Sequence, residues 1–176
     1  MAENVVLVDE QDNELGLMEK LEAHREGRLH RAFSVFVLNS NGDLLMQQRA
    51  FHKYHSGGLW TNTCCSHPRY REKTEDAAHR RLQEEMGFDC HLDKMFHFIY
   101  RAEFDNDMVE HEFDHLYVGY SDTDPVINPE EVAAWKWMSL AEVERDLDAN
   151  PHLYTEWFKI IYQRFSDQVK QGTWKL

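Results

Sequence analysis

The chain has 176 residues, of which 42% are hydrophobic, and its formal net charge is −13. This length and apolar content are typical of one domain with a substantial core, so we expect a single domain over residues 1–176. The negative charge argues against nucleic acids and anionic membrane surfaces as main partners, because both require a basic face on the protein.

Strand-like segments dominate the first part of the chain. Val5–Glu10 reads as a strand followed by a turn, and Leu17–Glu26 reads as a short helical or irregular segment. Ala32–Leu38 and Leu44–Arg49 are β-rich runs. The Asn41-Gly42 pair between them predicts a hairpin, because this dipeptide suits a tight turn.

The clearest helix signal runs from Thr74 to Met86. Thr74 can cap the helix, and Glu75 and Asp76 follow in its first turn, near the positive end of the helix dipole. Gly87 occupies the position where helices commonly end. We therefore expect this segment to be a helix that Thr74 caps.

Strands and helices continue to alternate in the second half. The expected strands are Phe96–Phe104, Val109–Tyr120 and Trp135–Met138, and an amphipathic helix is expected over Tyr154–Val169. Between them, Ser139 and Glu142 have the spacing of a capping box that opens another helix. This order fits an α/β fold with a mixed sheet and helices on its faces.

The three cysteines are Cys64, Cys65 and Cys90. Their odd number and spacing cannot form a disulfide framework and favour free thiols in a reducing compartment. The sequence shows no basic-then-apolar leader and no run of about 18 apolar residues. We therefore expect a cytoplasmic protein.

Cys65 stands two residues before His67 in the segment WTNTCCSHP. A thiol can act as a nucleophile or as a proton carrier. In an extended segment Cys65 and His67 share a face while Cys64 points away. Taken alone, however, a free cysteine is more often a small buried hydrophobe.

Glu110, Glu112 and Asp114 alternate along the expected strand over Val109–Tyr120. Period-2 geometry places them on one face, with neighbouring carboxylates about 7 Å apart, a spacing that suits joint metal ligation. The alternative is a solvated outer face of an antiparallel strand.

His24 and His30 could add imidazole ligands, although their spacing alone does not define a metal motif. With His67 as a third imidazole, the donor set suits Mn²⁺, Zn²⁺, Fe²⁺ or, less strongly, Mg²⁺. Three histidines and two glutamates would leave an octahedral ion one open position.

Glu85 lies on the same face of the expected helix as Ala78 and Leu82. A carboxylate on an apolar stripe is more often paired or metal-bound than left alone. A surface ion pair between Arg81 and Glu85 is the alternative.

Several rare segments together carry a family resemblance that extends from about Val5 to the region of Trp157. In chain order they are LEAHREGRLHRAFSVFVLN, QQRAFHKYHSGGLWTNTCCSHP, EDAAHRRLQEEMG, YRAEF and VEHEFDH. They resemble the type I isopentenyl-diphosphate isomerases, although that family usually has glycine where this chain has Ser66. The resemblance implies a Nudix-like mixed β-sheet sandwiched between helices, with an N-terminal extension that contributes metal ligands.

The helical stretch also resembles the Nudix pattern G-x5-E-x7-R-E-U-x-E-E-x-G-U, here from Ser66 to Phe88. The matching positions are Glu72, Arg80, Leu82, Glu84, Glu85, Gly87 and Phe88. Ser66 replaces the first glycine, and Arg81 replaces a glutamate that binds the catalytic metal of Nudix hydrolases. The resemblance to the isomerases implies that Arg81 contacts the substrate diphosphate instead.

The same resemblance implies roles for the other site residues. Cys65 and Glu112 would be acid/base groups on opposite sides of the substrate, with Tyr100 assisting proton transfer. One divalent ion, Mn²⁺, Zn²⁺ or Mg²⁺, would be bound by His24, His30, His67, Glu110 and Glu112. A Mg²⁺ that touches the diphosphate would be held by Glu85 and a backbone carbonyl near Cys65. The substrate itself would meet Lys20, Arg49, Lys53, Arg81 and Trp157.

The expected activity is interconversion of isopentenyl and dimethylallyl diphosphate, by protonation of the C3–C4 double bond and deprotonation at C2. Two alternatives are a Nudix-type pyrophosphohydrolase of a small diphosphate and a noncatalytic metal-binding module. The expected partner is a small isoprenoid diphosphate, bound by a monomer or weak homodimer.

Overall fold

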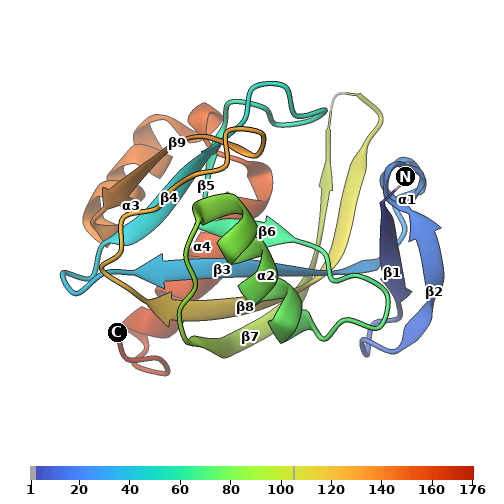
Figure 1. Ribbon diagram of the computed structural model, residues 1–176, viewed down its shortest axis with the longest axis horizontal. Coiled ribbons are helices and arrows are strands. Elements are labelled where there is room, and N and C mark those ends of the chain that lie inside the picture. The colour runs from blue at the N-terminus through green and yellow to red at the C-terminus, as the bar shows by residue number, and fades with distance from the viewer. Residues whose placement is uncertain (1–2, 105) are drawn as a thin grey trace.

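The computed structural model describes residues 3–104 and 106–176, which form a mixed β-sheet between helices (Figure 1). The strands are β1 (Asn4–Val8), β2 (Glu14–Glu19), β3 (His30–Leu38), β4 (Leu44–Arg49), β5 (Trp60–Thr61), β6 (Cys64–Ser66), β7 (Leu92–Glu103), β8 (Val109–Tyr120) and β9 (Val132–Met138). The helices are α1 (Lys20–Glu26), α2 (Thr74–Met86), α3 (Leu140–Ala149) and α4 (Glu156–Lys170), with a 3-10 turn at Pro151–Leu153. The expected α/β class is therefore confirmed.

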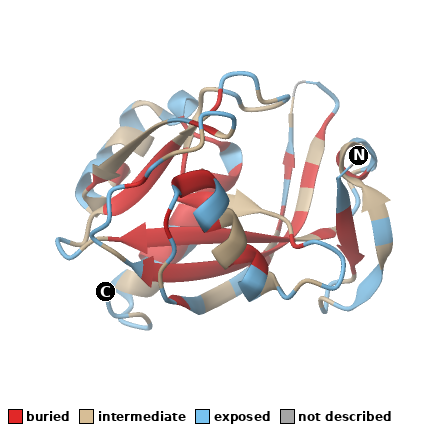
Figure 2. Cartoon of the chain, in the orientation of Figure 1, coloured by how far each residue is buried: buried red, intermediate tan, exposed pale blue. Residues whose placement is uncertain are grey.

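Strand β3 organises the sheet because it pairs with β1, β4, β6 and β8. It runs parallel to β8 and antiparallel to the other three. Its side chains alternate between two cores: Phe36 packs with Phe165 of α4, and Val35 packs with Leu82 of α2. Figure 2 shows that the central strands are buried along most of their length.

Helix α2 has the expected bounds, but the expected N-cap is wrong. Thr74 is the first helical residue, and Lys73 occupies the cap position without a capping side-chain hydrogen bond. The helix ends at Gly87, which has φ 74° and donates its backbone N–H to the carbonyl of Gln83. Because this backbone conformation is costly for residues with a Cβ, the glycine is structurally required.

The segment Leu17–Glu26 is partly strand, which the helical or irregular prediction missed. Leu17 pairs with Val6 of β1, and β2 continues to Glu19. Helix α1 starts only at Lys20, where the Glu19 side chain accepts a hydrogen bond from the backbone of Glu22. Pairing with β1 thus decides the conformation of a segment whose own pattern is ambiguous.

Several other sequence expectations hold. Gly42 adopts φ 80° in the β3–β4 hairpin, and Ser139 and Glu142 form the predicted capping box of α3.

Some element boundaries differ from the expected ones. Strand β7 begins four residues earlier than expected and β9 three residues earlier, and α4 begins at Glu156 rather than Tyr154. Among the described helices, none is long and apolar enough to span a membrane.

Candidate active site and metal centre

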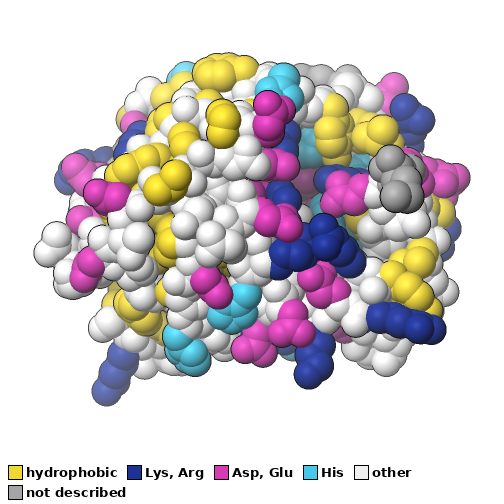
Figure 3. Space-filling model, viewed as in Figure 1, with side chains coloured by type: hydrophobic (Ala, Val, Ile, Leu, Met, Phe, Trp, Pro, Cys, Tyr) yellow, Lys and Arg dark blue, Asp and Glu magenta, His cyan; other side chains and the backbone are white. Residues whose placement is uncertain are grey.

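The sheet register gathers distant site residues at one pocket. Glu112 of β8 lies opposite His30 of β3, while Cys65 of β6 lies opposite Ser34 of the same strand. The pocket has a volume of about 350 Å³. Its lining includes Lys20, His24, Arg49, Lys53, Cys65, His67, Arg81, Glu85, Tyr100, Glu110, Glu112 and Trp157. Figure 3 shows acidic and basic side chains gathered around a hollow on this face.

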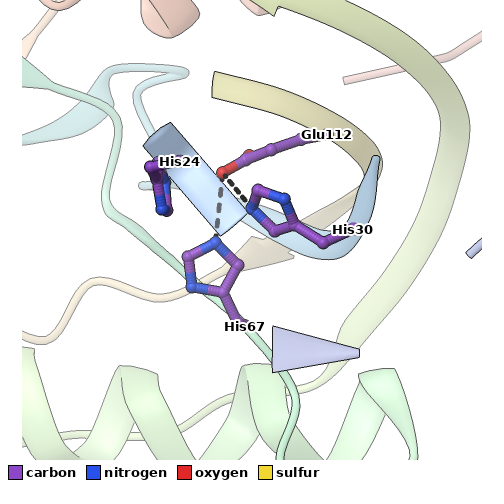
Figure 4. Close-up of side chains that lie close together, drawn as sticks. All are labelled: His24, His30, His67 and Glu112. Carbon is purple, nitrogen blue, oxygen red and sulfur yellow. Dashed lines mark hydrogen bonds and ion pairs between the residues drawn. The ribbon is translucent and has the colours of Figure 1, made fainter. Parts of the chain in front are cut away.

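Three histidines surround one carboxylate at the inner end of this site (Figure 4). Their ligand atoms and that of Glu112 lie within 4.8 Å of one another. Oε1 of Glu112 is 3.1 Å from Nε2 of His67 and 3.4 Å from Nε2 of His30. His24 completes the group from α1, so the N-terminal segment contributes one of its four side chains.

The ring nitrogens of these histidines are arranged as metal ligation requires. Nδ1 of His24 donates to the Lys20 carbonyl at 2.6 Å, and Nδ1 of His30 donates to the Arg28 carbonyl at 2.8 Å. Nε2 of both rings is buried without a hydrogen-bond partner among the described residues. Burial lowers the pKa of His24 and brings that of His67 to about 4, which keeps both rings neutral. A divalent cation would satisfy these unpaired nitrogens.

Tyr100 links the two buried carboxylates of β8. Its hydroxyl lies 2.9 Å from Oε2 of Glu110 and 2.7 Å from Oε2 of Glu112, so it can donate to either oxygen. Burial and the charge of Glu112 raise the pKa of Glu110 well above its usual range. Burial would also raise the pKa of Glu112, but His30 and His67 outweigh burial and hold it well below that range.

Glu110 belongs to a second ligand group. Its carboxylate lies with His24 and His55, and their ligand atoms are within 4.8 Å of one another. Sequence patterns do not select His55, because it lies in the loop between β4 and β5, which has no periodic signal. Asp114, on the same strand face, is also buried, and Ser34 donates a hydrogen bond to it at 2.9 Å. The solvated-face alternative for these carboxylates is therefore wrong.

The two adjacent cysteines point in opposite directions, as the extended segment predicts. Cys64 is fully buried in the core beneath α2, whereas Cys65 faces the pocket. Nε1 of Trp157 donates to Sγ of Cys65 at 3.2 Å, and this thiol donates to Oδ1 of Asn62 at 3.5 Å. Burial raises the pKa of Cys65, so the thiol carries its proton at neutral pH. Sequence reasoning did not select Asn62.

Four cations expected at the diphosphate line the pocket. Lys20 and Lys53 are held by Glu3 and Glu131. Nε of Arg49 and of Arg81 is buried without a hydrogen-bond partner in the described part of the chain. An incoming anion could accept from both groups. Arg69 and Arg80, which were not predicted for substrate binding, also line the pocket.

Glu85 lies beside these cations. It is 5% exposed, accepts from Gln47 at 2.9 Å and pairs with Arg81 at 2.6 Å. The helix-face inference is thus confirmed, while a purely surface ion pair is excluded. Mg²⁺ usually takes one or two carboxylates together with substrate phosphates, so one buried glutamate at this position fits such an ion.

Comparison with known proteins adds independent information. A NUDIX domain model matches residues 28–158. The chain is 51% identical to isopentenyl-diphosphate Delta-isomerase 2 of Aromatoleum aromaticum, covering 93% of this chain and 87% of that protein. It is 52% identical to isopentenyl-diphosphate Delta-isomerase of Pectobacterium atrosepticum, with 93% and 91% covered.

Solved structures share the fold at lower sequence identity. A MutT protein from Methanosarcina mazei superimposes with a TM-score of 0.65 at 17% identity, covering 81% of this chain and 96% of that one. A MutT NUDIX hydrolase from Burkholderia pseudomallei gives a TM-score of 0.61 at 17% identity, with 77% and 96% covered. These likenesses confirm the Nudix-like fold that the sequence predicted.

Proposed function

Since this chain belongs to the Nudix-domain family of isopentenyl-diphosphate Delta-isomerases, we propose that Cys65 and Glu112 are the acid and base with which it interconverts isopentenyl and dimethylallyl diphosphate. One observation carries the assignment. Cys65 and Glu112 line the same pocket: the Cys65 thiol is buried beside the Trp157 N–H, while His30 and His67 beside Glu112 favour the ionised carboxylate. Two proton carriers in opposite protonation states are what the reaction requires.

The reaction moves a double bond by adding one proton and removing another. An unactivated alkene is a weak base, so the Cys65 thiol must deliver its proton directly to C4 of isopentenyl diphosphate. This step leaves a thiolate and a tertiary cation at C3. The Glu112 carboxylate then takes a proton from C2, and the electron pair of that C–H bond forms the C2–C3 double bond. Proton exchange with water restores the thiol and the carboxylate.

Trp157 supports both the acid and the cation. Its indole N–H donates to Sγ of Cys65, and this hydrogen bond strengthens when the sulfur becomes a thiolate. Its ring lines the pocket, where a π face stabilises a desolvated cation by about 2 kcal/mol. Tyr100, hydrogen-bonded to Glu112, holds the carboxylate in place and assists its proton exchange.

The diphosphate is bound at the cationic end of the pocket. Lys20, Arg49, Lys53 and Arg81 bind it, and Glu85 with a backbone carbonyl near Cys65 would hold a Mg²⁺ there. The histidines, Glu110 and Glu112 would hold a second divalent ion, Mn²⁺, Zn²⁺ or Mg²⁺. When bound, these ions supply positive charge that offsets the phosphates and the buried carboxylates.

Proton NMR of isopentenyl diphosphate incubated with the metal-loaded protein in D₂O tests this function. We expect dimethylallyl diphosphate that has incorporated deuterium, because the proposed acid exchanges its proton with solvent. Release of free phosphate would identify a pyrophosphohydrolase instead. Unchanged substrate with fully loaded protein would refute the isomerase mechanism.

A further inference from the structure

His55 is a buried imidazole for which the isomerisation mechanism has no use. It lies in the 50–59 loop that joins β4 to β5, and its side chain is 7% exposed. Its ring stacks on Phe104 with centroids 5.3 Å apart and meets the edge of Trp157 at 5.7 Å. The loop thus places an imidazole between the aromatic rings of Phe104 and Trp157 and the Glu110 carboxylate of β8.

Nε2 of His55 faces the carboxylate of Glu110, in the second ligand group. Nε2 of His55 lies 3.7 Å from Oε1 of Glu110. Because Tyr100 is hydrogen-bonded to Oε2 of both Glu110 and Glu112, each carboxylate presents its Oε1 to histidines. Oε1 of Glu112 faces the imidazoles of His30 and His67. Oε1 of Glu110 faces the imidazole of His55.

The two ligand groups share His24, and this decides how many ions they can hold. Nδ1 of His24 is bonded to the Lys20 carbonyl, which leaves only Nε2 for a metal. One nitrogen lone pair binds one ion, so the two groups cannot each hold an ion through His24. A single ion common to both groups would use this lone pair once.

We propose that His55 is a sixth protein ligand of this ion, an inference that rests on the metal site of the proposed function. The complete set is His24, His30, His55, His67, Glu110 and Glu112. Six nitrogen and oxygen donors fill an octahedral coordination sphere, so the position that five ligands leave open is closed. Such an ion would have no position left for a substrate atom, and it would fix the loop that carries Lys53, which lines the pocket.

The loop is built tightly enough to hold such a ligand. The His55 carbonyl accepts a hydrogen bond from Arg49 at 3.3 Å. A Cβ on Gly57 would lie 2.6 Å from the Phe51 carbonyl oxygen, so only glycine permits this close approach. Gly58 follows with φ 78°. These contacts fix the path of the loop on either side of the imidazole.

Mn²⁺ titration of metal-free protein without substrate tests the proposal. Pulsed electron paramagnetic resonance counts the coordinated imidazoles, and chelator competition gives the Kd. We expect four imidazoles in the wild type, three in His55→Ala, and Mn²⁺ binding at least about 10-fold weaker in the variant. His52→Ala is the matched control, because His52 lies in the same loop with a side chain that is 64% exposed; it should bind Mn²⁺ as the wild type does.

His55→Phe separates ligation from packing, because it keeps a ring against Phe104 and Trp157 but has no nitrogen. It should lose Mn²⁺ affinity as His55→Ala does, and it remains informative if the alanine variant does not fold. If His55→Phe binds Mn²⁺ as tightly as the wild type does and its spectrum is unchanged, the proposal is overturned. Three imidazoles in the wild-type protein would also overturn it. Either result would leave the proposed isomerase activity intact, because deuterium incorporation tests that activity separately.

Discussion

Cys65 and its neighbour Cys64 form a natural pair of test positions. Cys65→Ala removes the proposed proton donor, so turnover should fall by at least about 10²- to 10⁴-fold. Cys64→Ala changes a core side chain beneath α2, so turnover should stay near the wild-type value while stability falls by about 1 kcal/mol. The NMR assay and thermal melts measure both effects. Near-normal turnover in Cys65→Ala would refute its role.

Trp157→Phe tests the hydrogen bond to the Cys65 thiol separately from the presence of an aromatic ring at position 157. Phenylalanine keeps a ring in the pocket but removes the N–H that reaches Sγ of Cys65 at 3.2 Å. A lost hydrogen bond of about 1 to 1.5 kcal/mol predicts a fall of about 10-fold in kcat with little change in KM.

Tyr162→Phe provides the control for Trp157→Phe. It removes a hydrogen bond from the same helix to the Leu140 carbonyl, away from the residues that line the pocket. Its kcat should remain at the wild-type value. Equal kcat values for wild type and Trp157→Phe would show that the indole N–H has no effect on the acid.

Residue patterns predicted some of the site and missed other parts for clear reasons. Strand alternation separates Cys65 from Cys64, because it needs only local geometry. His55 and Asn62 escaped prediction, since each acts through a contact made by a loop or turn with no periodic signal. The capping role expected of Thr74 was wrong because side-chain type alone does not fix the cap position.

At the scale of elements, pairing between strands decides whether the carboxylates of β8 are solvated or buried, a choice that the sequence left open. Glu110 and Glu112 could have formed a solvated face, but they are only 5% and 6% exposed. The parallel register of β3 and β8 places His30 opposite Glu112, although 82 residues separate them in the sequence. The loose spacing of His24 and His30 therefore concealed a real cluster, because the partner strand lies far along the chain.

Gly87→Ala probes the end of α2, the helix that carries Arg81 and Glu85. Gly87 has φ 74°, and an added Cβ would lie 2.3 Å from the carbonyl oxygen of Val126. Both the backbone conformation and this collision oppose a side chain, so stability should fall by more than about 1 kcal/mol. Urea unfolding measures the loss.

Gly172→Ala is the matched control for this collision. Gly172 has φ 72°, but a Cβ there would meet nothing within 4 Å among the described atoms. It therefore carries the backbone penalty alone, and its loss should be smaller. Equal losses in the two variants would mean that contact with Val126 contributes nothing.

At the scale of the whole molecule, the metal centre ties the N-terminal segment to the sheet. His24 comes from α1, whereas the other members of the cluster come from β3, β8 and the segment after β6. An ion that binds only the folded chain stabilises it by about 2.7 kcal/mol at 100 times its Kd. Chelation should therefore lower the Tm, and added Mn²⁺ should restore it in a thermal melt. A Tm that is indifferent to both treatments would contradict this coupling.

Asp12 forms a second tie between the N-terminal hairpin and the sheet, and it predicts a pH dependence. Its carboxylate lies 2.8 Å from Nε of Arg31 on β3 and 2.9 Å from Nε2 of His115 on β8. Burial would raise the pKa of Asp12, but the hydrogen bonds from His115 and Arg31 outweigh burial and lower it. The ionised carboxylate thus stabilises the folded state.

Because the pKa of Asp12 is lower in the folded chain than in the unfolded chain, its contribution to stability decreases as the pH falls. The stabilisation is complete above the unfolded-state pKa of about 4 and is lost as the pH falls through the folded-state pKa. Asp12→Asn should therefore reduce the free energy of unfolding by about 1 to 2 kcal/mol at pH 7. The difference from the wild type should narrow below about pH 4. Urea unfolding of both proteins in chelator, from pH 7 to pH 3, measures the difference without a contribution from bound metal. A difference that stays constant over this range would show that the charge of Asp12 does not hold the hairpin to the sheet.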